Sequence, residues 1–317
     1  MRVPVQNVPV GPEEAGQKLL QYLVRRLSGQ APQSLILRFI RTGQVRVNGG
    51  RAKPFDRLPL GAVVRIPPFE AEEPGSMRPE IRPETASAAS RAAAAPGRAP
   101  FPVIFEDQEL LVIEKPAGLP THPGSGWTDS VQTRLAAFYA GAAFAPTPAH
   151  RLDRDTSGLL AVAKTYACLR HLQEAFQDKT AGKSYLAWVR GAFDLCAPGR
   201  TARLEDKLEK KGRGGREKVE AGSGKRAVTL ASPIRIKSAE SLVSLDIQTG
   251  RTHQIRVQLA SRGFPIVGDA KYGGGKGPMH LHAYRLRIDG KTFVSLPGWT
   301  GRFDVADMPG LTESELR

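Results

Sequence analysis

Residues 150–165 are HRLDRDTSGLLAVAKT, and this stretch passes from a polar loop into an apolar segment. Six of the seven residues from His150 to Thr156 are polar or charged, and Ser157 and Gly158 then supply turn chemistry. The apolar run LLAVA that follows is typical of a buried strand. Because a loop joined to a buried strand holds its side chains at a defined place above a sheet, this stretch predicts a functional loop.

Alternating apolar and polar residues predict further strands on both sides of this loop. ELLVIEKP at 109–116 is typical of a buried strand, while KSYLAWVRG at 183–191 and SLVSLDIQ at 241–248 alternate with a period of two. Strands dominate this part of the chain, and long helices are few. We therefore predict an α+β domain over 101–317, built on a mixed, largely antiparallel sheet.

Two helices are expected beside this sheet. Thr165 can serve as the N-cap of a helix that follows the LLAVA run. The segment RTHQIRVQLASRG predicts a second helix that begins at about Thr252 and ends at Gly263, since glycine favours the left-handed conformation at a helix end. Arg251 would then lie where the free N–H groups of a first helical turn can meet a phosphate.

The first 100 residues divide into a small basic unit and a linker. Apolar residues recur at helical spacing over 19–27 and 35–40, and QVRVNGG at 44–50 has the pattern of a strand hairpin with an Asn-Gly turn. We expect two short helices and a small strand ribbon over 1–70. Residues 71–100 hold nine alanines and five prolines but no Leu, Val, Phe, Tyr or Trp, and this composition predicts a flexible linker.

The formal net charge of +15 predicts a polyanionic partner. Residues 1–70 carry 11 basic against 4 acidic side chains, 101–200 carry 10 of each, and 201–317 carry 21 against 13. A compositional bias toward arginine could explain part of the excess, but it does not explain this segregation. A membrane surface would need a long basic amphipathic helix, which the chain lacks, so we expect nucleic acid and no membrane.

Length and composition exclude several classes of protein. A chain of 317 residues with 40% hydrophobic side chains can bury a core, which rules out wholesale disorder. The sequence has no run of about 18 apolar residues and no signal-peptide pattern, so a cytoplasmic protein is expected. Cys168 and Cys196 lack a C-x-x-C spacing and predict neither a zinc ribbon, nor a redox dithiol, nor structural disulfides.

Two carboxylates in the polar loop are candidates for chemistry. Asp155 precedes Thr-Ser-Gly, which is ordinary turn and capping chemistry. Asp153 is either a reactive carboxylate or the partner of Arg151 or Arg154 in a surface ion pair. A metal site would need further oxygen ligands, and no acidic cluster supplies them, so we expect no metal.

Tyr185 and the arginines of TGRTHQIRV at 249–257 are further candidates. Arg256 lies a turn inside the expected helix and could reach a buried carboxylate. The alternative is a basic helix exposed to solvent, but the apolar residues next to Arg256 make this alternative less favourable. Tyr185, taken alone on a strand, is most simply a core residue. The residues by themselves indicate an RNA-binding protein with a candidate reactive carboxylate, and no more.

The combination of motifs resembles two known families. HRLDRDTSGLLAVAKT, KSYLAWVRG, GKRAVT, TGRTHQIRVQLASRGFPIVGDAKYG and LHA are similar, in this order, to the motifs of RluA-type pseudouridine synthases. Residues 14–68 resemble an S4 domain, a small RNA-binding module, most specifically in IRTGQVRVNGGRAKPFDRLPLGAVVRI. The two resemblances together cover nearly the whole chain outside the linker.

The resemblance implies a role for individual residues. Asp153 would be the catalytic aspartate, Tyr185 the active-site tyrosine, and Arg256 the arginine that pairs with the aspartate. Three residues would bind the substrate: Arg151 at the space left by the flipped base or at its phosphate, Arg251 at a phosphate, and Leu281 at the base. Four arginines of the S4-like module would contact RNA, namely Arg25, Arg38, Arg41 and Arg46.

The resemblance also implies the reaction and its partners. The enzyme would isomerise uridines of RNA to pseudouridine without any cofactor, acting as a monomer on 23S ribosomal RNA or a pre-ribosomal large-subunit particle. A tRNA-directed synthase and a non-catalytic ribosome-assembly factor are the alternatives. A phosphoryl-transfer enzyme would need a phosphate-binding glycine loop that the chain lacks. Gln258 and Phe264 depart from the family, where histidine is common, which places only local packing or RNA contacts in doubt.

Overall fold

The computed structural model describes residues 2–27, 30–71, 99–123, 129–211 and 218–306, together with Met308 and Leu311. The linker predicted over 71–100 falls almost entirely outside these residues. Residues 212–217 of the basic segment 201–317 also fall outside them. Within the described residues, no helix is long and apolar enough to span a bilayer.

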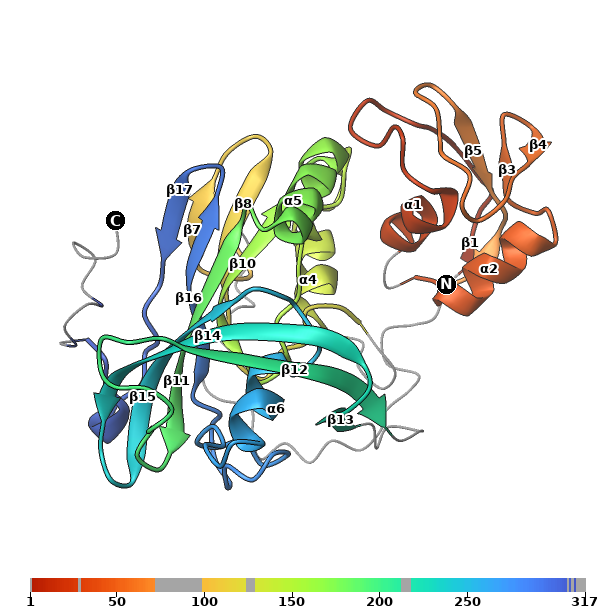
Figure 1. Cartoon of the computed structure of the whole chain (residues 1–317). Helices are drawn as coiled ribbons and strands as arrows, with labels where there is room; N and C mark the ends of the chain where they lie inside the picture. Colours follow the sequence, from red (N-terminus) through yellow and green to blue (C-terminus); the bar gives the residue numbers. More distant parts are fainter. Residues whose placement is uncertain are drawn as a thin grey trace.

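The larger unit is built on a sheet of eleven strands (Figure 1). Their bounds are β7 Val103–Glu106, β8 Leu110–Lys115, β9 Thr147–Pro148, β10 Ser157–Ala163, β11 Gly182–Arg190, β12 Ala202–Lys211, β13 Lys218–Ala221, β14 Lys225–Ile236, β15 Glu240–Ile247, β16 Leu281–Ile288 and β17 Lys291–Val294. The main order is β13-β12-β14-β15-β11-β16-β10-β8-β7, with β17 paired to β16 and β9 to β10. Only the β10–β16 pair is parallel among the described pairs, which confirms the predicted mixed, largely antiparallel α+β fold.

Three α-helices accompany the sheet in the described part of the larger unit. They are α4 Val131–Phe138, α5 Tyr166–Asp178 and α6 Gln254–Ala260, followed by a short 3₁₀ turn, η2, at Gly301–Phe303. The predicted cap of α5 is confirmed, because Thr165 Oγ1 accepts a hydrogen bond from the Cys168 amide at 3.0 Å. Helix α6 begins two residues later than predicted, since His253 has a left-handed φ of 52°.

The start of β10 fixes the polar loop against β16. Gly158 pairs with Ala283 of β16, and its φ is +110°. A Cβ atom at Gly158 would lie 2.3 Å from the Ala283 carbonyl oxygen and 2.7 Å from its nitrogen. Only glycine allows so close an approach of the two backbones. The polar loop that precedes β10 is therefore held at a set height above the sheet.

The N-terminal unit has the predicted helices and ribbon. Its elements are β1 Arg2–Val3, β2 Gln6–Pro9, α1 Leu19–Arg26, α2 Gln33–Arg41, β3 Arg46–Val47, β4 Gly50–Arg51, β5 Val63–Ile66 and β6 Phe69–Glu70. Strands β2-β5-β3-β4 form one sheet, and β1 pairs with β6. Asn48 and Gly49 both have positive φ, 50° and 77°, as the turn of a two-residue hairpin requires.

This unit packs against the start of α5. The Tyr166 amide donates a hydrogen bond to the Glu13 carbonyl at 3.0 Å. The guanidinium of Arg25 lies 4.4 Å from the ring centroid of Phe144 and donates to Gln17. Arg25 is only 8% exposed. The expectation that Arg25 contacts RNA does not fit this placement, because the larger unit covers its charged group.

We predict that Gly158→Ala destabilises the fold strongly. The new methyl group meets the Ala283 backbone, and the positive φ adds strain, so the free energy of unfolding should fall by about 3 kcal/mol. Urea unfolding followed by circular dichroism measures this change. Gly141→Ala is the control, since its φ is also positive at +91° but no atom lies within 4 Å of the added carbon; about 1 kcal/mol is expected there. Equal effects of the two substitutions would contradict the steric argument.

Candidate active site

The predicted catalytic and substrate-binding residues meet at one cavity. It has a volume of about 310 Å³ and lies between the polar loop, strands β11 and β16, and the start of α6. All six residues named from the sequence line it: Arg151, Asp153, Tyr185, Arg251, Arg256 and Leu281. Segments more than 100 residues apart in the chain therefore converge on one site.

Asp153 places its carboxylate beside two nitrogen-bearing side chains. Its Oδ2 atom lies 3.3 Å from Arg256 Nη1, which donates a hydrogen bond to it, and 3.9 Å from His253 Nε2. The Asp153 side chain is 16% exposed, so its carboxylate is accessible from the cavity. Its partner is thus on α6, and the alternative of a surface ion pair with a loop arginine does not apply.

Asp155, the second carboxylate of the loop, has a separate environment. Its two oxygens accept hydrogen bonds from the guanidinium of Arg154 at 2.8 and 3.1 Å. Both side chains are well exposed. Within the described ranges, no three His, Cys, Asp or Glu side chains converge as a metal site would require.

The main partner of Arg256 is a residue that the sequence did not single out. Its Nε and Nη2 atoms donate to the two carboxylate oxygens of Asp269 at 2.7 and 2.8 Å. The side chains of Arg256 and Asp269 are 7% and 1% exposed. Arg256, expected to pair with Asp153, therefore forms its bidentate pair with Asp269, while Asp153 receives one remaining N–H. Asp269 stands in the quoted GDAKYG motif, and only its burial reveals its role.

The two carboxylates decide the charge state of Arg256. Burial alone would lower the pKa of this guanidinium, but Asp269 and then Asp153 outweigh it and raise the pKa above its usual value. Arg256 therefore stays protonated inside the fold. A permanent positive charge in contact favours the ionised form of a neighbouring carboxylate.

His253 and Tyr272 complete the surroundings of Asp153. His253 Nδ1 and the Tyr272 hydroxyl lie 2.8 Å apart, and the Tyr272 ring centroid is 5.2 Å from the Arg256 guanidinium carbon. Burial lowers the pKa of His253 to about 4, although Asp153 opposes the shift. At neutral pH this imidazole is uncharged. The sequence contains both residues in its motifs, but spacing alone does not show that they meet.

Tyr185 and Leu281 form an apolar wall of the cavity. Both are buried, at 6% and 3% exposure, and both belong to the same core cluster. Burial, and to a lesser extent the charge of Asp153, raises the pKa of Tyr185. The phenol is thus neutral, and its ring is available as a stacking surface beside the carboxylate.

Arg151 and Arg251 are exposed where the cavity opens to solvent. The Arg251 Nε donates to the carbonyl of Arg226 at 3.1 Å, and its backbone N–H donates to Gln254 Oε1 at 3.1 Å. Because α6 begins at Gln254, Arg251 lies before the first helical turn, and its own amide is not free, since the Gln254 side chain accepts from it. Arg251 can meet an anion with its remaining guanidinium N–H groups only.

Lys115 anchors the polar loop from beneath, a role that the sequence did not reveal. Its side chain is fully buried, and its Nζ donates to the carbonyls of Pro116, Leu119 and Arg154 at 2.8, 2.8 and 3.0 Å. Burial lowers the pKa of Lys115 to about 7, opposed by the carboxylates of the loop. Three carbonyl acceptors match the three N–H bonds of an ammonium group. Lys115 therefore fixes the backbone directly after Asp153.

The two departures from the family motif are packing residues. Gln258 is fully buried, and its amide bonds to Thr229 at 2.7 Å and to the Leu204 carbonyl at 3.1 Å. Phe264 packs on Phe193 with ring centroids 5.1 Å apart. Neither residue lines the cavity, so both departures lie outside the group of residues around Asp153.

Comparisons with known proteins agree with this geometry. A protein-family model described as RNA pseudouridylate synthase matches residues 109–261. Ribosomal large subunit pseudouridine synthase C of Pasteurella multocida is 36% identical over 296 residues, which cover 90% of this chain and 86% of that protein. The protein of the same name from Haemophilus influenzae is 36% identical over 305 residues, covering 90% and 87%.

A solved structure shares the fold. Human RNA Pseudouridylate Synthase Domain Containing 4 superposes with a TM-score of 0.51 and 24% identity, over 62% of this chain and 89% of that chain. This similarity concerns the fold alone.

We predict that Asp269→Asn lowers the stability of the fold. The substitution keeps the shape of the side chain but leaves Arg256 without its buried counter-ion, so the free energy of unfolding should fall by about 3 kcal/mol. Urea unfolding at pH 7 measures it. Glu174→Gln breaks the exposed pair with Arg170 at 2.9 Å and should change stability by less than about 0.5 kcal/mol. A similarly small effect of Asp269→Asn would show that the buried pair is not needed.

Proposed function

The chain belongs to the RNA pseudouridylate synthase family and is an RNA pseudouridine synthase, and on that premise we propose that Asp153 acts on uridines of large-subunit ribosomal RNA. One observation carries the assignment of the residue. The carboxylate of Asp153 faces a cavity wide enough for a base and is held there at 3.3 Å by Arg256, whose charge Asp269 fixes from behind.

The reaction needs an ionised carboxylate beside the ribose. The N1–C1′ bond of uridine must break, the uracil must turn, and C5 must bond to C1′. Asp153 can serve either by attacking C1′ or by removing the proton at C2′, as carboxylates do in related glycosyl chemistry. Both roles need the anion, and Arg256 places a positive charge 3.3 Å from the Asp153 carboxylate.

The base must leave the helical stack to reach Asp153. Extrusion of a nucleotide costs a few kcal/mol, which contacts in the pocket must offset. The Tyr185 ring can stack on the extruded uracil, and Leu281, in the same wall of the cavity, can contact the base beside it. Arg151, exposed beside the loop, is placed to fill the vacated space or to bind the adjacent phosphate.

The choice of RNA rests on relatives and on the N-terminal unit. The similar proteins of two bacteria are named for the large ribosomal subunit, which supports 23S ribosomal RNA, free or in a pre-ribosomal particle, as the substrate. A monomer acting in the cytoplasm, with the S4-like unit as a second RNA-binding surface, fits this proposal.

The exposed arginines of the N-terminal unit support RNA binding. Arg38 and Arg41 are three residues apart on α2 and share a helix face. Arg46 pairs in register with Arg51 on one side and Arg65 on the other. Like charges directly opposite one another weaken a ribbon. A polyanion that binds this surface would relieve the repulsion.

We predict that Asp153→Asn abolishes catalysis without loss of RNA binding. Asn keeps the shape and removes the reactive charge, so single-turnover formation of pseudouridine should fall at least about 10³-fold. Nucleoside chromatography of digested large-subunit ribosomal RNA measures the product, and filter binding measures affinity. Asp155→Asn, at the neighbouring carboxylate, should leave the rate within about threefold of wild type. Product formation by Asp153→Asn at the wild-type rate would refute the assignment.

We predict that replacing Arg38, Arg41 and Arg46 together by Gln weakens RNA binding through charge alone. The slope of log affinity against log salt should become less steep by about 2 to 3 units, since about three phosphate contacts are lost. The single-turnover rate at saturating RNA should stay unchanged. Gln substitutions at Arg170 and Arg203, two exposed arginines of the larger unit, are the control. An unaltered salt dependence would remove the proposed role of this surface.

A further inference from the structure

Lys183 is a cation inside the active-site cavity whose role the chemistry above leaves open. It lies on β11 two residues before Tyr185, so both side chains project from the same face of the sheet. Both line the cavity that holds Asp153. The Lys183 Nζ atom sits 4.1 Å from the ring centroid of Phe176 on α5. The ammonium group is thus held against an aromatic wall of the cavity.

The charge of Lys183 has no acidic partner in the part of the chain that the structure describes. Burial lowers the pKa of Lys183 to about 8, which still leaves the amine mostly protonated at neutral pH. The nearby His150 is a neutral imidazole, because burial holds its pKa well below its usual value, and it brings no negative charge to Lys183. A partly buried charge without a counter-ion is costly, and a ligand that brings negative charge would offset this cost.

The proposed reaction creates negative charge inside the cavity. When the N1–C1′ bond breaks, its electron pair stays with the uracil and spreads onto O2 and O4. This holds whether Asp153 attacks C1′ or removes the C2′ proton. C5 then bonds to C1′ as the Asp153–C1′ bond breaks, or as Asp153 returns the proton to C2′; the proton on C5 is lost, and N1 gains a proton. Between these steps the free base is an anion that is held in the cavity.

We propose that Lys183 is a catalytic residue that donates a hydrogen bond from its ammonium group to a carbonyl oxygen of the departing uracil and stabilises the anion. The proposal rests on the proposed function of the cavity. Lys183 keeps its proton throughout and acts by electrostatics. A fixed charge aimed at the atoms where charge develops lowers the barrier because it is already oriented before the reaction.

The position of Lys183 favours the base over the RNA backbone as its partner. Arg151 and Arg251 are exposed at the same cavity, whereas Lys183 is partly buried between Phe176 and the sheet. Phosphates stay hydrated at the surface of a complex, within reach of exposed arginines. The extruded base is the part of the substrate that goes inward, to the Tyr185 wall along which Lys183 lies.

The test varies the stability of the leaving anion. Full-length enzyme is given large-subunit ribosomal RNA transcribed with either uridine or 5-fluorouridine, whose electron-withdrawing fluorine stabilises the uracil anion. Single-turnover loss of the nucleoside at the modified position, which reports cleavage of its N1–C1′ bond, is followed by chromatography on both RNAs, because C5 of the fluorinated base carries no proton to lose and cannot give pseudouridine itself. Lys183→Met should slow the reaction about 10²-fold on uridine RNA but about 10-fold or less on fluorinated RNA. RNA affinity should change less than about threefold, and Lys183→Arg should restore most of the rate.

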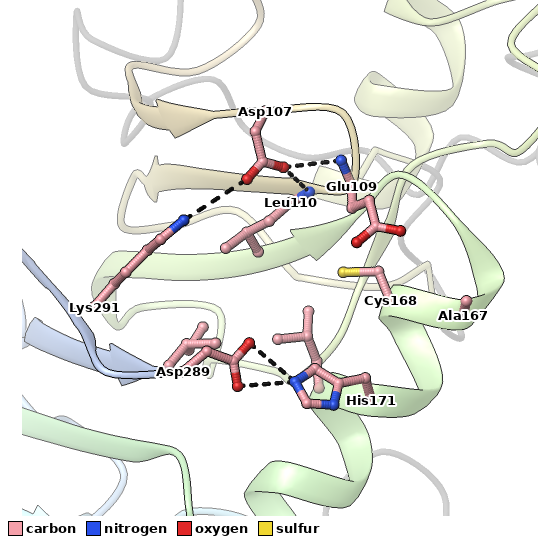
Figure 2. A pocket seen from close by; sticks show the side chains of 10 residues that line it. Asp107, Glu109, Leu110, Ala167, Cys168, His171, Asp289 and Lys291 are labelled. Atoms are coloured by element: carbon pink, nitrogen blue, oxygen red, sulfur yellow. Dashed lines mark hydrogen bonds and ion pairs between the residues drawn. The ribbon is translucent and has the colours of Figure 1, made fainter.

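Lys291→Met is the matched control. Lys291 also lies over a phenylalanine, with Nζ 4.7 Å from the Phe105 ring centroid, but in a separate pocket beside Asp107 and His171 (Figure 2). Its removal should leave both rates unchanged. Because the two substrates are compared within one preparation of each variant, partial unfolding cannot produce a difference between them. Lys183→Gln repeats the comparison with a polar side chain if the methionine variant does not fold.

Each other outcome overturns the proposal. Equal losses on both RNAs would mean that Lys183 does not act on the leaving base. A loss of affinity alone would assign it to the phosphate backbone, and an unchanged rate would leave it without a role. If the wild-type enzyme reacts with neither RNA, the proposed function itself fails. If the wild-type enzyme reacts and the Lys183→Met variant reacts equally fast, only the proposal for Lys183 fails.

Discussion

The buried ion pair between Arg256 and Asp269 is the interaction on which the site depends. Its two hydrogen bonds of 2.7 and 2.8 Å orient the guanidinium so that one N–H remains for Asp153. The Arg256–Asp269 pair joins α6 to the loop before β16. The hydrogen bond from Arg256 to Asp153 connects both to the loop before β10. A carboxylate that must stay ionised in a half-buried site needs a fixed positive charge. Asp269 supplies the charge that keeps Arg256 both buried and protonated.

Elements of the fold could be predicted from the sequence where one physical signal dominated. The apolar run after Gly158 and the alternation at 183–191 and 241–248 gave strands that the structure contains as β10, β11 and β15. Strands β12 and β13 were missed, because their charged residues hide a sparse apolar pattern in which Leu204 and Leu208 alone point inward on β12. The parallel pairing of β10 with β16 joins distant segments, and no local pattern could indicate it.

The residues of the site were likewise predicted only in part. Resemblance selected Asp153, Tyr185 and Arg256, which the structure brings to one cavity, but it could not assign which carboxylate Arg256 holds in a bidentate pair. The choice of partner depends on burial, since Asp269 is only 1% exposed. The sequence does not show which of its aspartates are buried, so it could not single out Asp269. Lys115 was also invisible, because its three acceptors are backbone carbonyls, which every sequence contains.

The charge distribution separates two tasks that conflict. RNA binding calls for positive charge, and in the proposed function the arginines around Arg46 and at the cavity opening supply it on the surface. Cleavage of a glycosidic bond calls for an anion at the ribose, and a bare carboxylate there would repel the phosphates on either side. In the proposed function, Arg256 offsets part of the charge of Asp153 without quenching the carboxylate, because a guanidinium cannot accept a proton from it or give one up at neutral pH. A net positive cavity with one embedded carboxylate can thus attract an RNA strand and still react with it.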